Sequence, residues 1–228
     1  MLVEFWDFCR PNSLRTLPYV KAWHERYAEA GLRVVGVHCP GFTPSREEPA
    51  VRAAVERLGI HYPVVIDSEL EVWQDYGNQV WPARYLFDGR ARLVEYHHGE
   101  GAYEETELAI GELLGVRREP LAALRPEDRP GARLAAQTQD QAGAYSGRYE
   151  AGGVWAVLDG AGSVSVRWSA DADASGAGEP AGGEHELAVA QPGAYALVEH
   201  PRHTHGTLEL ALRGQLRCLA TCFTPGLA

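Results

Sequence analysis

An apolar strand, a long amphipathic helix and a second apolar strand follow one another at the start of this chain, and this order constrains its fold more than any other feature. The strand Leu2–Trp6 leads into the helix Ser13–Glu29, and Gly31 ends that helix. Leu32–His38 is almost continuously apolar, which is typical of a strand buried in a parallel sheet. The order predicts a βαβ unit and therefore an α/β layered domain.

The segments up to Gly115 continue this alternation of helices and strands. The sequence predicts three further helices, Pro49–Leu58, Leu70–Tyr76 and Tyr103–Leu114. It also predicts three further extended segments, Tyr62–Ile66, Arg84–Phe87 and Arg92–Tyr96. The last two flank the turn Asp88-Gly89, so we expect a β-hairpin there, followed by a final helix.

The chain changes character after Gly115. Residues 116–144 contain several prolines and little periodicity, which is typical of a loosely packed linker. Residues 145–228 read as short strands separated by Gly- and Pro-rich turns, and Asp171–Gly183 reads as a flexible loop. The sequence therefore predicts an α/β domain over 1–115, a linker over 116–144 and a small all-β, sandwich-like domain over 145–228.

Charge and hydropathy exclude several classes of protein. The 228 residues carry 31 acidic and 21 basic side chains, a net charge of −10, and the bases form no patch that would attract nucleic acid. No apolar run reaches the roughly 18 residues of a membrane span. The stretch Met1–Asp7 lacks the basic region of a signal peptide. We therefore expect a cytoplasmic protein without a nucleic-acid or membrane partner, whose 4 cysteines are thiols.

Four blocks of the first half carry a family resemblance in matching order. They are Val3–Tyr19, Val34–Pro40, Tyr76–Asn78 with Trp81–Leu86, and His97–Gly101. Together they resemble thioredoxin-like proteins of the TlpA/redoxin group, in particular the thioredoxin-like C-terminal region of DipZ-type proteins. The resemblance implies a thioredoxin fold. It also implies a partner, either a protein or a small molecule, that carries a thiol or a disulfide. In DipZ-type proteins the thioredoxin-like domain is followed by a β-rich domain that is similar to carbohydrate-binding modules. Residues 145–228 resemble a shortened version of that domain. The resemblance implies that this β-domain binds a ligand.

The redox motif of that family is changed here. The family places Cys-x-x-Cys at the start of the first helix, where the helix N-terminus stabilises a thiolate and the second thiol resolves the mixed disulfide. Counting from Phe5-Trp6, these two positions fall on Arg10 and Ser13. Because neither carries a thiol, the ordinary dithiol mechanism is absent from this motif.

Cys9 and Cys39 could form a relocated pair of thiols. Cys9 precedes the first motif position, and Cys39 follows the second strand, which neighbours the first strand in a thioredoxin fold. Arg10 would lower the pKa of Cys9 by direct charge proximity. The alternative is that both cysteines are small apolar residues packed near a loop.

The remaining candidate residues surround the same motif. Glu4 aligns with the buried acid that accepts protons in thioredoxins, or else is a strand residue paired with an arginine. Trp81-Pro82 matches the family's cis-proline, so we expect a cis bond there. The resemblance assigns five residues to the substrate groove: Trp6, Arg10, Ser13, Trp81 and Pro82.

Clustered histidines and two late cysteines are the other features of note. His200, His203 and His205 are spaced as at a strand end, Pro201 interrupts them, and no fourth ligand is evident. We interpret them as solvated loop histidines and expect no metal and no cofactor. Cys218 and Cys222 would face the same side of a strand without bridging, and we expect both to fill core space.

Two functions remain open. The first is a thioredoxin-family redox protein that uses Cys9 with Cys39. The second is a redox-inactive thioredoxin-fold binding or scaffold protein that uses the groove beside Pro82 and its β-domain. Ancestry favours the first, and the Arg10-to-Ser13 motif favours the second.

Overall fold

The computed structural model describes residues 1–171 and 182–228 and divides the chain into two compact units, Met1–Pro130 and Gly131–Ala228. The loop expected over Asp171–Gly183 lies almost entirely outside the described residues. No helix in the described part of the chain is long and apolar enough to cross a membrane.

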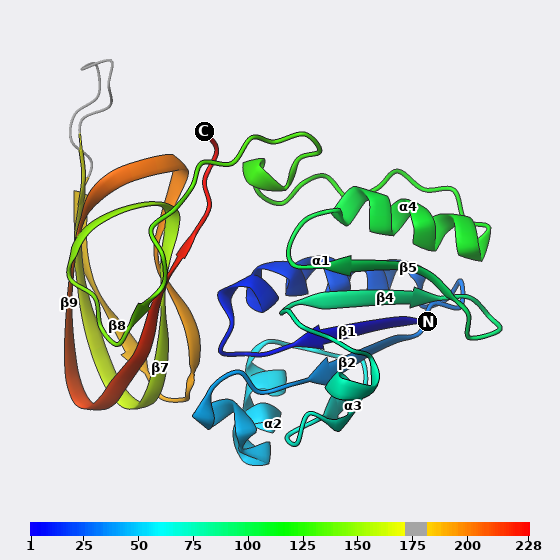
Figure 1. Ribbon diagram of the computed structural model, residues 1–228, viewed down its shortest axis with the longest axis horizontal. Coiled ribbons are helices and arrows are strands. Elements are labelled where there is room, and N and C mark those ends of the chain that lie inside the picture. Colours follow the sequence, from blue (N-terminus) through cyan, green and yellow to red (C-terminus); the bar gives the residue numbers. More distant parts are fainter. Residues whose placement is uncertain (172–181) are drawn as a thin grey trace. The chain divides into compact units, whose positions relative to one another are not determined.

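The first unit is built on a five-stranded mixed sheet with the strand order β3-β2-β1-β4-β5 (Figure 1). The central strand β1 (Leu2–Trp6) pairs in parallel with β2 (Val34–His38) and antiparallel with β4 (Ala83–Phe87). β3 (Val64–Ile66) and β5 (Leu93–His98) form the two edges. The α/β class predicted for this unit is confirmed.

Helices pack on both faces of this sheet. They are α1 (Pro11–Tyr27), α2 (Glu48–Arg57), α3 (Glu71–Asp75) and α4 (Tyr103–Leu114), with short 3₁₀ turns η1 (Thr43–Arg46) and η2 (Pro126–Asp128). α1 packs against α4, where the rings of Tyr19 and Tyr103 stack with their centroids 3.8 Å apart. On the opposite face the Phe5 ring of β1 contacts Tyr76 at the end of α3, with centroids 4.9 Å apart.

The alternation of side chains along β1 separates two environments. Val3 and Phe5 join an apolar cluster with Val37 and Tyr85 on the α3 face. Glu4 points to the other face, where its partner across the sheet is Arg84. The Arg84 guanidinium lies over two aromatic rings. It is 5.6 Å from the ring centroid of Trp23 on α1 and 5.1 Å from that of Tyr103 on α4.

Residues 116–130 pack against the first unit, although the sequence assigns them to a linker. The Tyr19 hydroxyl donates a hydrogen bond to Asp128 (2.7 Å) and accepts one from the Leu124 amide (2.7 Å). Arg15, buried on α1, forms an ion pair with Glu127 at 3.0 Å. The structure therefore ends the first unit at Pro130 rather than at the predicted Gly115.

The second unit is all-β, which confirms its predicted class. Its sheet has the order β6-β9-β7-β8, with β6 (Gln141–Ala142), β7 (Gly147–Ala170), β8 (Gly182–Val189) and β9 (Gly193–Thr224). β7 pairs with β9 along both of its edges, since Ala156 faces Tyr195 on one side and Thr221 on the other. The sheet consequently curls on itself around an apolar core (Figure 1).

Two long bent strands replace the short strands that the sequence predicts for this unit. Glycines sit where the strands bend and approach closely. Gly160 has a φ of +99°, and a Cβ there would lie 2.1 Å from the Gln215 carbonyl oxygen. Because glycine has no Cβ, strand pairing continues through a position that reads in the sequence as a turn.

Candidate functional site

The junction between β1 and α1 is organised by the carboxylate of Asp7, which the sequence reasoning did not single out. The buried Asp7 side chain accepts hydrogen bonds from the Cys9 amide (2.9 Å), the Gly41 amide (2.7 Å) and the Ser45 hydroxyl (3.3 Å). Because its donors come from the segment before α1 and from the segment after β2, the Asp7 carboxylate links these two loops. The only sequence signal for it is an acid directly after an apolar strand.

Arg10 immediately precedes α1, at the N-cap of that helix. Its guanidinium lies between two aromatic rings, 4.9 Å from the centroid of Phe42 and 4.7 Å from that of Trp81. It also covers Gly41, where a Cβ would come within 2.6 Å of the Arg10 Nε. Among the described residues no carboxylate lies within 4.0 Å of this guanidinium. Stacking therefore holds a cation in place at the start of the helix.

Trp81 connects Arg10 to the end of β2. The bond Trp81–Pro82 is cis, which confirms the expectation from the sequence. The Trp81 indole donates a hydrogen bond to the Cys39 carbonyl (2.9 Å) and stacks on Trp73, with ring centroids 4.2 Å apart. The structure thus brings Arg10, Trp81 and Pro82 together.

Trp6 and Ser13, also assigned to the groove, are fully buried, each 0% exposed. The Ser13 hydroxyl accepts a hydrogen bond from the Asp7 amide (3.2 Å). The Trp6 ring packs edge-on against the His38 ring of β2, with centroids 5.0 Å apart. Because a buried side chain cannot touch a docked partner, these two residues support the groove from inside in this structure.

Neither candidate cysteine forms a disulfide, and both are fully buried. The Cys39 amide donates a hydrogen bond to the Trp6 carbonyl (2.9 Å), so Cys39 lies beside the end of β1. Its thiol packs on the α3 face and donates a hydrogen bond to Asp67 (3.4 Å). Burial raises the pKa of the Cys39 thiol well above its usual value, and the carboxylates of Asp67 and Asp7 raise it further. Thiolate, the reactive form, is therefore disfavoured at Cys39.

Glu4 is completely buried in the first unit. It accepts a hydrogen bond from the Tyr62 hydroxyl (3.1 Å) and lies opposite Arg84 in the strand register. Burial raises the pKa of Glu4 to about 7, while Arg84 and the Tyr62 hydrogen bond oppose that change. Glu4 therefore has both an arginine across the sheet and a raised proton affinity.

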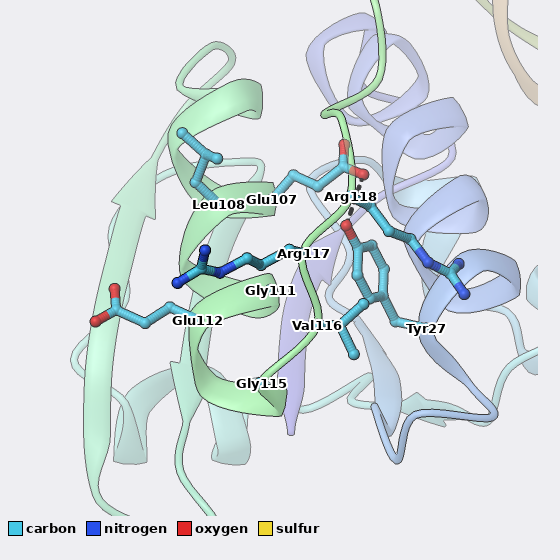
Figure 2. Close-up of a pocket in the computed structure, with 9 residues that line it drawn as sticks. All are labelled: Tyr27, Glu107, Leu108, Gly111, Glu112, Gly115, Val116, Arg117 and Arg118. Atoms are coloured by element: carbon cyan, nitrogen blue, oxygen red, sulfur yellow. Dashed lines mark hydrogen bonds between the residues drawn. The ribbon is translucent and has the colours of Figure 1, made fainter.

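A pocket of about 700 Å³ lies elsewhere in the first unit, between α1, α4 and residues 115–118 (Figure 2). At its wall the Tyr27 hydroxyl donates a hydrogen bond to the buried carboxylate of Glu107 (3.0 Å). Glu107 also accepts hydrogen bonds from the Trp23 indole (3.1 Å) and the Leu121 amide (2.8 Å). None of the candidate site residues lines this cavity, and Glu107 is already satisfied by protein donors.

The three clustered histidines of the second unit lie in two different places. His200 stacks on Tyr149, and its Nε2 lies 2.8 Å from the Tyr149 hydroxyl. His203 and His205 instead approach Glu150 of the neighbouring strand. Cys218 is free and packs against the core of this unit.

The strand order of the first sheet, a helix that begins where the central strand ends, and a cis-proline beside that junction define a thioredoxin-like domain. Within this class the chain is similar to the protein DipZ of Mycobacterium tuberculosis. The two are 33% identical over 144 residues, which cover 60% of this chain and 21% of DipZ. The chain thus spans about a fifth of the length of the DipZ proteins it matches.

Two further comparisons cover about half of this chain. Thiol-disulfide oxidoreductase ResA of Halalkalibacterium halodurans is 27% identical over 99 residues, covering 43% of this chain and 53% of ResA. The crystal structure of a thiol-disulfide isomerase from Corynebacterium glutamicum has a TM-score of 0.47 and 20% identity, covering 51% of this chain and 80% of that one. No protein-family model matches the chain. The sequence relatives place it among thioredoxin-like proteins related to thiol-disulfide oxidoreductases.

Proposed function

We propose that this chain is a redox-inactive thioredoxin-fold binding protein, with the partly exposed side chains of Arg10 and Trp81, beside the buried Pro82, as its contact surface. The observation that carries the proposal is Arg10, stacked between Phe42 and Trp81 in the place of the attacking cysteine. A guanidinium cannot attack a disulfide. It offers a positioned cation with several N–H donors instead.

The second motif position supports the same proposal. A resolving thiol must reach the mixed disulfide, but Ser13 carries a hydroxyl that is buried and engaged with the Asp7 amide. Arg10 and Trp81 both remain partly exposed beside Pro82. A surface with a cation and an aromatic ring but no exposed thiol suits binding of a protein partner better than electron transfer.

Insulin reduction tests this function directly. We expect no turnover by the full chain in a thioredoxin-type assay with dithiothreitol, because neither motif position carries a thiol. Arg10→Cys together with Ser13→Cys should create measurable turnover, since the new first cysteine would precede α1, where the helix dipole favours a thiolate.

Arg10→Cys alone is the matched control. It restores the attacking thiol without the resolving one, so it should form mixed disulfides but turn over far more slowly than the double variant. Insulin reduction by the unaltered chain at the rate of a thioredoxin would refute the proposal.

The second candidate function is a thiol redox protein that uses Cys9 with Cys39. Its favourable observation is the hydrogen bond from the Cys39 amide to the Trp6 carbonyl, which brings Cys39 to the end of the strand that leads into Cys9. The observation against this function is that the Cys39 thiol is buried and donates a hydrogen bond to Asp67. The ligand-binding function therefore has the stronger support.

Alkylation distinguishes these two functions. Because both cysteines are fully buried in the native fold, we expect iodoacetamide to modify neither with a fast phase at neutral pH. Treatment with hydrogen peroxide, followed by peptide mapping, should yield no Cys9–Cys39 bridge. A fast phase that Cys9→Ser removes but Cys222→Ser leaves intact, together with such a bridge, would establish the redox function instead.

A further inference from the structure

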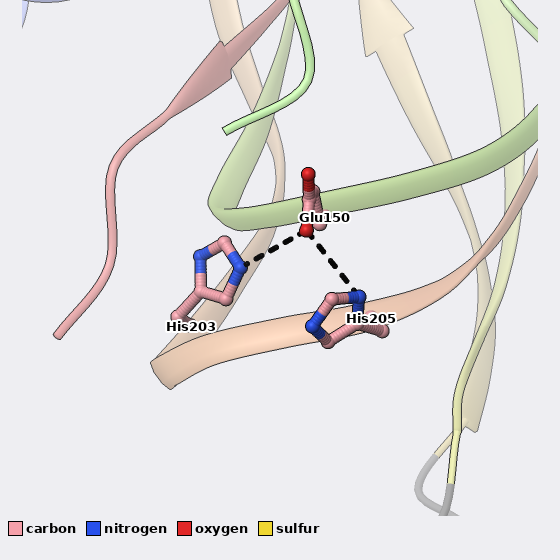
Figure 3. A group of neighbouring side chains, drawn as sticks. All are labelled: Glu150, His203 and His205. Atoms are coloured by element: carbon pink, nitrogen blue, oxygen red, sulfur yellow. Dashed lines mark ion pairs between the residues drawn. The ribbon is translucent and has the colours of Figure 1, made fainter. Parts of the chain in front are cut away.

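Three side chains of types that can bind a metal meet on the second unit, where the sequence predicts solvated histidines. Glu150 lies on β7, and His203 and His205 lie on β9 (Figure 3). One donor atom from each side chain can be chosen so that all three lie within 4.8 Å of one another. We propose that Glu150, His203 and His205 bind a divalent transition-metal ion, with Zn²⁺ as the best fit.

The strand register places these residues on one face. Glu150 is paired directly with His205 across the β7–β9 ladder. His203 precedes His205 by two positions, and residues two apart on a strand point to the same face. Directly opposed residues of an antiparallel pair have Cβ atoms only about 5 Å apart. The three side chains therefore converge because of pairing between segments distant in the sequence.

The two separations between Glu150 and the histidines fit a shared ion better than hydrogen bonds. Glu150 Oε2 lies 3.6 Å from His203 Nε2 and 3.4 Å from His205 Nδ1. Both separations exceed the range of about 2.7–3.2 Å for an N–H···O hydrogen bond. Tetrahedral zinc with metal–ligand bonds of about 2.0–2.2 Å requires ligand atoms about 3.3–3.6 Å apart. Both measured separations lie within that interval.

The backbone around the three ligands is held in place. The Glu150 amide donates a hydrogen bond to the Thr138 hydroxyl (2.9 Å), and the Thr138 amide donates one to the Glu150 carbonyl (2.8 Å). The His203 amide donates a hydrogen bond to the Leu227 carbonyl (3.1 Å). His203 Nδ1 is buried without a partner among the described residues, whereas Nε2 faces Glu150, so Nε2 is the nitrogen placed to coordinate.

The charges and donor types favour zinc. Two imidazoles and one carboxylate are the ligand set that Zn²⁺ takes with a fourth position open, whereas Mg²⁺ and Ca²⁺ prefer oxygen ligands alone. The nearby Arg148 guanidinium forms an ion pair with Asp171, which offsets its repulsion of a cation. A depression of about 240 Å³, lined in part by Glu150, His205 and Thr138, adjoins the ligands and leaves room for a water molecule as the fourth ligand.

Titration of the full chain with Zn²⁺ and Co²⁺ tests the site. After treatment with a chelator, the chain should bind one Zn²⁺ per molecule by calorimetry. Co²⁺ should give the visible absorption of a tetrahedral site without a thiolate charge-transfer band, because all three ligands are nitrogen or oxygen donors. Glu150→Gln and His205→Ala should each weaken Zn²⁺ binding by more than about tenfold, since even the loss of an outer-shell partner costs that much.

His185→Ala is the matched control, because His185 is exposed on β8 of the same unit and outside the cluster. It should bind Zn²⁺ as tightly as the unaltered chain. Circular dichroism should show the same fold for His205→Ala, whose wild-type side chain is 60% exposed. No saturable binding, a cobalt–thiolate band, or equal affinity in all variants would overturn the proposal.

Discussion

Ending the chain at Gly115 should lower the free energy of unfolding of the first unit by about 5 kcal/mol or more, relative to a chain that ends at Pro130. The segment that is removed supplies partners to buried polar groups of α1 and α4. Glu107 loses the Leu121 amide, Arg15 loses Glu127, and the Tyr19 hydroxyl loses Asp128. Each hydrogen bond to a charged group contributes about 1.5–3 kcal/mol, and an unpaired buried group adds a desolvation cost.

Urea unfolding of the two truncated chains, followed by circular dichroism, measures this difference. Since whole domains are stable by only about 5–15 kcal/mol, the shorter chain should be marginal or unfolded. Arg52→Gln in the longer chain is the control, because it breaks an exposed ion pair with Glu48 and should cost less than about 1 kcal/mol. Equal midpoints for the two chains would mean that residues 116–130 contribute nothing and that the first unit ends near Gly115.

The second large effect concerns pH. Stability should fall as the pH rises from about 4.5 to about 7, because the folded state binds the Glu4 proton more tightly than the unfolded state does. The pKa of Glu4 is raised from 4.5 to about 7 in the fold, chiefly by burial. An acid whose pKa is raised by folding does not destabilise the fold below the pKa it has in the unfolded chain. It destabilises the fold in full above the pKa it has in the folded chain. At about 1.4 kcal/mol per pH unit, the total is about 3 kcal/mol.

Glu4→Gln isolates this contribution. The neutral amide cannot ionise, so the variant should gain about 3 kcal/mol relative to the unaltered chain between pH 4.5 and pH 8. The comparison uses urea unfolding at a series of pH values, with the exposed Glu48→Gln as a control that keeps the original slope. Parallel pH curves for Glu4→Gln and the unaltered chain would show that Arg84 compensates the Glu4 charge in full.

The first sheet and its helices were predictable because their signals are local. Short, mainly apolar runs predict β1 and β2, the apolar stripe predicts α1, and Trp81-Pro82 predicts the cis bond that the structure contains. The second unit was harder to predict in detail. Its glycines read as turns between short strands, whereas the structure uses Gly160 to bend one long strand. Whether a glycine ends a strand or bends it depends on the segment paired beside it.

The candidate sites divide in the same way. From the sequence by itself we predict that the thioredoxin-like motif lacks its two thiols, because neither Arg10 nor Ser13 can supply one. Only the tertiary structure decided that Arg10 is stacked between Phe42 and Trp81, and that Glu150 meets His203 and His205. These contacts join segments far apart in the chain. Their existence depends on strand register and loop packing, which are set when the whole unit folds and have no local signal.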